Sequence, residues 1–166
     1  MKKKIKVLQV IPTLGYGGAE AGCYDLAHFL PEMKWKSYIV TSGGALIHYI
    51  KKEKVKVFKL PVHSKNPILI LMNGIIISMI ILFYNINIVH ARSRAPAWSC
   101  LIATKLTARK FVTTFHGTYN FKNKFKKIYN SVMVRSHLVI AGSNFIFSHI
   151  NENYGNFFLK QKRKLL

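Results

Sequence analysis

Three short segments of the chain combine glycine, arginine and histidine in patterns that suit binding of an anionic ligand. The first is the glycine-rich run Gly15-Tyr16-Gly17-Gly18-Ala19-Glu20, which separates a short apolar segment from a helical pattern. Glycines let the backbone approach a ligand closely, and free amides at a helix N-terminus attract an anion. The run predicts phosphate binding, and the alternative is a tight turn that only packs.

A dinucleotide-binding fingerprint is a further alternative for this run, and two features argue against it. The fingerprint needs a third glycine where the chain has Glu20. It also needs an acidic residue after the second strand, where the chain has Thr41 and Ser42. We therefore do not expect NAD binding.

The other two segments supply cationic and histidine side chains. In the run from His90 to Arg94, Arg92 and Arg94 can grip a phosphate or carboxylate through two hydrogen bonds each. In the run from Thr113 to Thr118, His116 leaves a β-rich segment just before a glycine and can touch a ligand. Taken alone, each has a structural explanation, a solvated basic loop and a satisfied structural histidine.

The elements that position these segments alternate between strand and helix six times. Strands are predicted at residues 5–11, 37–41, 56–60, 87–90, 110–115 and 138–141, and helices at 19–30, 45–52, 68–83, 95–106, 121–132 and 143–154. The alternation predicts an α/β, Rossmann-like parallel sheet of about six strands, in the order 3-2-1-4-5-6, with helices on both faces. Ligands bind such sheets at the carboxyl ends of the strands, where the three segments and Ser143, a predicted N-cap, all fall.

In order and spacing, these motifs resemble the N-terminal domain of glycosyltransferase family 4, a family with the GT-B fold. The motifs are Gly-Gly-Ala-Glu after the first strand, Ile-Val-His-Ala, Thr-Thr-Phe-His-Gly, and Ala-Gly-Ser before the last helix. The resemblance covers residues 5–155. It implies that Gly17, Gly18 and Glu20 lie against the nucleotide-sugar diphosphate and the acceptor.

The resemblance also implies roles for the remaining polar residues and for metals. His116 would lie near the transferred sugar as the catalytic candidate, Arg92 and Arg94 would face the acceptor, and Ser143 joins the binding residues at the strand ends. No metal or cofactor is expected, and the nucleotide sugar would bind only with a donor domain. The departures are Ala21, where the family often has arginine, and the C-terminal donor domain, which we expect this chain to lack.

The chain is predicted to divide into residues 1–155, the N-terminal Rossmann-like domain, and residues 156–166, a basic tail that looks truncated or frame-shifted. The function implied is that of the acceptor-side half of a bacterial hexosyltransferase-like enzyme in envelope polysaccharide or lipopolysaccharide synthesis. Such a half is expected to be inactive alone. The alternatives are a non-catalytic acceptor- or membrane-binding module, or half of a split transferase whose donor domain is separately encoded.

The charge balance bears on the partners. The chain has 26 Lys and Arg against 5 Asp and Glu, and a net charge of +21 attracts anions; an AT-rich coding sequence is the alternative cause. No specific nucleic-acid motif occurs. The segment from Phe121 to Val132 combines aromatics with Lys122, Lys124, Lys126 and Lys127, and predicts docking on an anionic membrane surface, with a solvated face as the alternative.

Two further features bear on location. The segment from Ile68 to Phe83 is apolar almost all round, and its 16 residues predict a packed helix beside the sheet, with membrane insertion as the alternative. The two cysteines, Cys23 and Cys100, sit in apolar surroundings and indicate a reducing compartment. We expect a cytoplasmic protein, peripheral at the inner face of the cell membrane.

Overall fold

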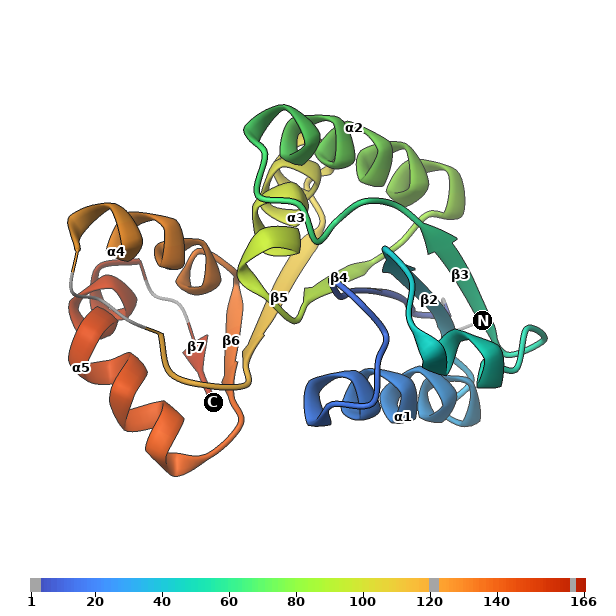
Figure 1. Cartoon of the computed structure of the whole chain (residues 1–166), viewed down its shortest axis with the longest axis horizontal. Helices are drawn as coiled ribbons and strands as arrows, with labels where there is room; N and C mark the ends of the chain where they lie inside the picture. The colour runs from blue at the N-terminus through green and yellow to red at the C-terminus, as the bar shows by residue number, and fades with distance from the viewer. Residues whose placement is uncertain (1–3, 120–122, 162–163) are drawn as a thin grey trace.

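The structure, a computed structural model, describes residues 4–119, 123–161 and 164–166. Its centre is a parallel sheet of seven strands in the order β3-β2-β1-β4-β5-β6-β7, drawn in Figure 1. The strands are β1 (Lys6–Val10), β2 (Lys36–Thr41), β3 (Val55–Lys59), β4 (Ile88–Ala91), β5 (Lys110–Phe115), β6 (Leu138–Ala141) and β7 (Lys164–Leu165). The predicted order 3-2-1-4-5-6 is confirmed, and β7 adds a short seventh strand.

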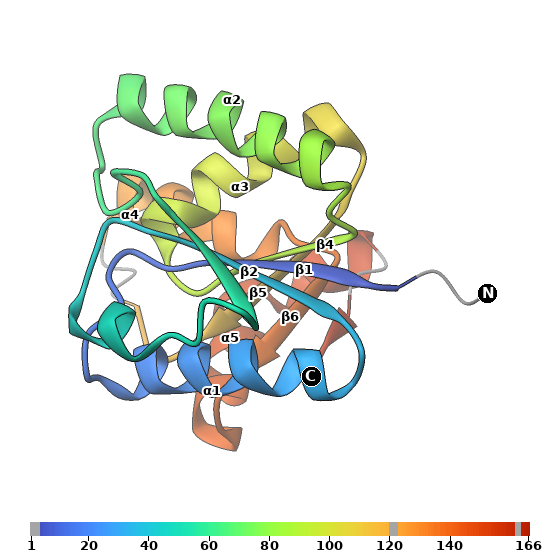
Figure 2. The same ribbon diagram turned by 90° about the vertical axis from the view of Figure 1, so that its right-hand side faces the viewer.

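Helices cover both faces of the sheet, as the sequence predicts. They are α1 (Gly18–Glu32), α2 (Pro67–Tyr84), α3 (Arg94–Thr107), α4 (Lys124–Asn130) and α5 (Asn144–Gln161), with 3-10 turns η1 (Ala45–Tyr49) and η2 (Ser131–Val134). Figures 1 and 2 show α1 on one side of the strands and α2 with α3 on the other.

The alternation of side chains along the central strands produces two hydrophobic cores. In β2, Tyr38 and Val40 join the larger core, which α2, α3, η2 and α5 complete, while Ile39 joins the smaller core beneath α1. Neighbouring residues of a strand point to opposite faces, so one strand can serve both cores. This two-sided burial explains why the strands have continuous apolar sequences.

The last helix is longer than the sequence predicts. The prediction ended it at Tyr154, whereas α5 continues through residues 155–161, and β7 then pairs with β6. Phe158 is buried in the larger core and explains the extension. These residues of the expected basic tail therefore take part in the fold.

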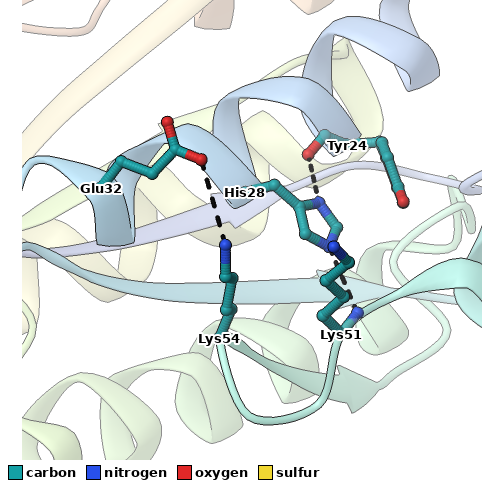
Figure 3. Close-up of polar contacts among 5 residues, drawn as sticks. All are labelled: Tyr24, His28, Glu32, Lys51 and Lys54. Atoms are coloured by element: carbon teal, nitrogen blue, oxygen red, sulfur yellow. Dashed lines mark hydrogen bonds and ion pairs between the residues drawn. The ribbon is translucent and has the colours of Figure 1, made fainter.

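A histidine ties the middle of α1 to the loop before β3 (Figure 3). The backbone N–H of Lys51 donates to His28 Nε2 at 3.2 Å, so the proton of the neutral ring sits on Nδ1, which donates to the Tyr24 carbonyl at 2.9 Å. Lys54 and Glu32 form a long, exposed ion pair beside it. These contacts stabilise the loop before β3, and they lie away from the carboxyl edge of the sheet.

The helix α2 is packed on one face only, so the prediction of a packed helix is half correct. Its inner face is made partly of Asn73, Gly74 and Ser78. A Cβ at Gly74 would lie 2.9 Å from Ile102 Cγ2, which shows how closely α2 and α3 approach. Small and polar residues therefore share the inner face with Ile77 and Ile81, and most other bulky apolar residues of the helix are left exposed.

Two glycines after β2 hold the glycine-rich turn in place. Gly43 and Gly44 both have a left-handed backbone, with φ of 146° and 130°. The Gly43 carbonyl accepts the N–H of Leu14, and a Cβ at Gly44 would collide with the Leu14 backbone. Side chains disfavour this backbone region at both positions, and at Gly44 the space for a side chain is also already filled.

Candidate functional site

The glycine-rich turn leads from β1 into the N-terminus of α1, which faces the carboxyl edge of the sheet. Gly17 is the N-cap residue of α1, and no side chain caps it. No atom of the described residues lies within 4 Å of where a Cβ of Gly18 would be, so the backbone here is open to a ligand. The Glu20 carboxylate folds back against Gly17 and occupies part of the space at the helix N-terminus.

Arg92 directly follows β4, is buried, and supports this turn through hydrogen bonds to β1 and α1. Its Nε donates to Gln9 Oε1 at 3.0 Å, and its Nη2 donates to the Gly22 carbonyl at 3.2 Å. Gln9 Nε2 in turn donates to the Cys23 carbonyl at 3.0 Å. Arg92 therefore links β1, β4 and the first turns of α1, a set of contacts that its expected role at the acceptor did not include.

The charge of Arg92 is only partly compensated. Within the described part of the chain, no carboxylate lies in ion-pair contact with it, and its hydrogen-bond partners are a neutral amide and a neutral carbonyl. Burial lowers its pKa, and the Cys23 thiol opposes that shift. A guanidinium held in this way presents a positive field at the carboxyl edge of the sheet, which favours an anion.

His90 lies on β4 beside Arg92 and is buried. Its Nε2 is 2.7 Å from Thr114 Oγ1. Burial, then the positive charge of Arg92, then His116 lower the pKa of His90 from 6.5 to about 3. His90 is therefore neutral across the physiological range and acts as a hydrogen-bonding support under the site.

His116 follows β5 and keeps a large part of its surface exposed. Partial burial and then Arg92 lower its pKa, whereas Glu20 opposes the shift. The ring of His116 is therefore neutral near pH 7. A neutral imidazole at the surface of the site can donate or accept a hydrogen bond with a ligand hydroxyl.

The structure thus brings together some of the predicted site residues and separates others. His116 lies within electrostatic range of both Arg92 and Glu20, and the Glu20 carboxylate lies beside Gly17. Arg94 instead turns toward α4, where its Nη1 donates to Asn130 Oδ1 and its guanidinium stacks 4.3 Å from the Tyr119 ring centroid. Ser143 is the N-cap of α5, as predicted, and its Oγ accepts the N–H of Ile146.

The predicted membrane lysines fall on α4 or just before it. Lys124, Lys126 and Lys127 are exposed there, together with Phe125. Lys122 and Phe121 lie outside the described residues. Within the described ranges, no three His, Cys, Asp or Glu side chains lie close enough together to hold a metal ion.

Two residues of the site were missed by sequence reasoning. Gln9 is a buried amide inside an otherwise apolar strand, and that exception was the signal available for it. Tyr119 packs under Arg94 and against Phe115, and its sequence context gives no comparable signal. His90 was noted in the sequence only as part of the basic loop.

Comparison with known proteins supports the identification of the fold and the family. The chain is similar to the crystal structure of a glycosyltransferase from Rickettsia africae ESF-5, with 46% identity, a TM-score of 0.80, and 92% of this chain and 40% of that one covered. It is similar in fold to HepE from Anabaena, solved with UDP and glucose, with 16% identity and a TM-score of 0.68. That match covers 90% of this chain and 41% of HepE. No curated protein matches the chain.

The chain spans about 40% of the length of these solved structures. The model of Glycosyltransferase Family 4 matches residues 16–159, a stretch that begins in the glycine-rich turn and ends within α5. Since that stretch covers most of the chain, the chain belongs to Glycosyltransferase Family 4.

Proposed function

We propose that the chain is the acceptor-side domain of a sugar transferase that acts on a glycan or lipid-linked acceptor in bacterial envelope polysaccharide or lipopolysaccharide synthesis. The observation that carries the proposal is the grouping of Glu20, Arg92 and His116 around the open N-terminus of α1. The UDP and glucose held by HepE support nucleotide sugar as the class of donor. Membership of the family supports the transferase chemistry.

The site residues have distinct tasks in this proposal. The reaction breaks the bond between the sugar C1 and the diphosphate oxygen and forms a bond from C1 to the acceptor oxygen, while the proton of the acceptor hydroxyl passes to the departing diphosphate. Arg92 and the free amides of Gly17 and Gly18 stabilise the negative charge that grows on the diphosphate. His116, with its neutral ring, hydrogen-bonds a hydroxyl of the transferred sugar and holds it in place.

We propose that this domain does not turn over alone, and that a donor domain supplies the remaining contacts to the nucleotide. The alternative is a binding module without catalysis, or half of a split enzyme. One observation favours the binding module: the described cluster holds a single carboxylate, Glu20, which already lies against Gly17. The buried cysteines Cys23 and Cys100, both free, support a cytoplasmic location.

The test uses the 46% identity to the Rickettsia africae enzyme. The chain replaces the matching segment of that enzyme, and release of nucleoside diphosphate is measured with a panel of nucleotide sugars, with and without membrane-lipid acceptors. We expect no steady turnover from the chain alone and turnover from the chimera. In the chimera, His116→Ala should lower the rate by on the order of 10²-fold, because the transferred sugar is no longer held in position.

Exposed His137, which directly precedes β6 and so lies at the opposite, amino edge of the parallel sheet, provides the matched control, and His137→Ala in a folded chimera should leave the rate unchanged. Steady turnover by the chain alone would contradict the proposed inactivity. A folded chimera that binds the nucleotide sugar but does not turn over, beside an active parent enzyme, would favour the binding module.

A further inference from the structure

The outer face of α2 is a continuous apolar surface, which we call the α2 face. It consists of Ile68, Leu71, Met72, Ile75, Ile76, Met79, Leu82 and Phe83, all exposed. The spacing of three and four residues places them along one side of the helix. Only 28% of the helix is buried, and Phe83 is 82% exposed. An apolar surface of this extent on a soluble protein marks a contact with a partner or a membrane.

The orientation of α2 is fixed by polar contacts on its inner side. Ser99 Oγ of α3 donates to the Ile70 carbonyl at 3.0 Å, and Asn73 Nδ2 donates to the Pro61 carbonyl at 3.1 Å. Gly74 packs directly on Ile102. Among the described residues, α2 is the one helix long and apolar enough to cross a membrane by length and composition. Crossing would break these contacts, whereas lying flat keeps all of them.

Both ends of the α2 face are flanked by lysines. At the C-terminal end, Lys6 Nζ donates to the Tyr84 carbonyl and Lys56 Nζ donates to the Tyr84 hydroxyl, each at 2.7 Å. At the N-terminal end, exposed Lys65 precedes the helix and lines a groove of about 520 Å³ with Phe125 and Lys126 of α4. The exposed part of α4 therefore continues the α2 face and adds positive charge.

The carboxylates lie elsewhere in the fold. Glu20, Asp25 and Glu32 belong to α1, Glu53 precedes β3 and Glu152 belongs to α5. The segments of α2, α3 and α4 contain none. Figure 1 shows that α1 lies across the sheet from α2. The apolar surface is thus bordered by cations. An anionic partner would be attracted to it, whereas a second copy of the chain would bring the same lysines together and be repelled.

We propose that α2 lies flat in the interface of an anionic lipid bilayer, with the α2 face among the acyl chains and the flanking lysines at the headgroups. Interfacial helices combine an apolar face with basic residues in this way. The sequence-based prediction gave the docking role to the lysines of α4. Here the apolar contact comes from α2, and α4 supplies supporting charge at one end of it.

Co-sedimentation with phosphatidylcholine vesicles that contain phosphatidylglycerol tests the proposal. The variant Leu71→Gln/Met79→Gln/Phe83→Gln removes apolar residues that are exposed, so its fold, checked by circular dichroism, should persist. We expect its vesicle affinity to fall at least about tenfold. The matched control, Phe29→Gln/Met33→Gln/Phe145→Gln, changes three exposed apolar residues of α1 and its C-cap and of α5, and should bind like the unaltered chain.

Salt separates apolar insertion from attachment by charge alone. Raising the salt from about 0.15 M to about 1 M shortens the Debye length from about 8 Å to about 3 Å. We expect part of the binding to survive about 1 M salt in the unaltered chain. Changing Lys124, Lys126 and Lys127 to Gln should weaken binding less than the α2 variant does. Complete release by salt, with α4 lysines decisive, would overturn the role of α2.

A second readout does not depend on the multiple variant. An environment-sensitive fluorophore is attached at Met79→Cys and, as control, at Met33→Cys; the native cysteines are buried. We expect a blue shift on vesicle addition at position 79 only. Absence of vesicle binding, equal binding by the α2 variant, or an unshifted label at 79 would each overturn the proposal. None of these outcomes bears on sugar transfer, because no donor sugar is present.

Discussion

The bracing role of Arg92 can be tested by a double-mutant cycle with Gln9. Arg92 is only 9% exposed and Gln9 is fully buried, and the two are joined by a hydrogen bond of 3.0 Å. Replacing Arg92 by Met leaves Gln9 Oε1 buried without this donor. A buried polar group left unsatisfied costs about 1–3 kcal/mol, and loss of the hydrogen bond to Gly22 adds to it.

The removal of a buried charge offsets part of that cost, since Arg92 has no carboxylate partner among the described residues. We therefore expect Arg92→Met to lower the free energy of unfolding by about 2 kcal/mol. For a chain of this size, that corresponds to a fall in Tm of about 4–8 °C. Gln9→Met should lower the free energy of unfolding by a similar amount, because it removes a hydrogen-bond acceptor of the buried guanidinium.

The most informative measurement is the free energy of unfolding of the double variant, Arg92→Met/Gln9→Met. Replacing both partners by apolar side chains of similar size leaves neither group unsatisfied, and such pairs can be nearly neutral. We expect its loss to be smaller than the sum of the single losses by about 1–2 kcal/mol, measured by urea unfolding. Single losses that add to within about 0.5 kcal/mol would refute the bracing role. Arg94→Met, on the same loop but bonded to Asn130, should show no coupling to Gln9.

Two further predictions concern stability. Gly44→Ala should lower the free energy of unfolding by roughly 3 kcal/mol or more, because the new Cβ meets the Leu14 backbone. Gly43→Ala should lower it less, because the described residues leave space for a Cβ there and only the positive φ is unfavourable. Equal falls in Tm for the two variants would contradict this. His90 has a folded pKa of about 3, below its ordinary 6.5, so its contribution is fully present above about pH 6.5 and is lost as pH falls toward 3. The free energy of unfolding should fall in that window by up to about 1.4 kcal/mol per pH unit, and His90→Gln should flatten the slope; an unchanged slope would show that His90 is not buried neutral.

Much of the fold could be predicted because the strands are buried on both faces. Val7 to Val10 and Ile39 to Thr41 are continuous buried runs bounded by glycine turns, and they mark the interior strands clearly. The edge strand β7 could not be predicted, since two residues carry no periodicity. The extension of α5 depends on Phe158 reaching the core, which is a tertiary contact invisible to a local pattern.

The positions of the candidate site residues in the fold could be predicted, and their contacts with one another could not. Strand-to-loop positions located Gly17, Arg92 and His116 at the carboxyl edge of the sheet. Spacing could not distinguish Arg92, which is buried against Gln9, from Arg94, which stacks on Tyr119. That distinction depends on residues of β1 and on the segment after β5, which are distant in the sequence.

The arrangement of α2 has a consequence for how the chain behaves after synthesis. In the folded chain, the other described residues leave the eight apolar residues of the α2 face uncovered, so folding of this chain does not remove the tendency to self-associate. Concentrated protein in plain buffer should therefore precipitate through correctly folded molecules. A mild detergent or added lipid should restore solubility without changing the thermal unfolding of the domain. Purification losses would then depend on concentration and lipid content, and stabilising the core would not reduce them.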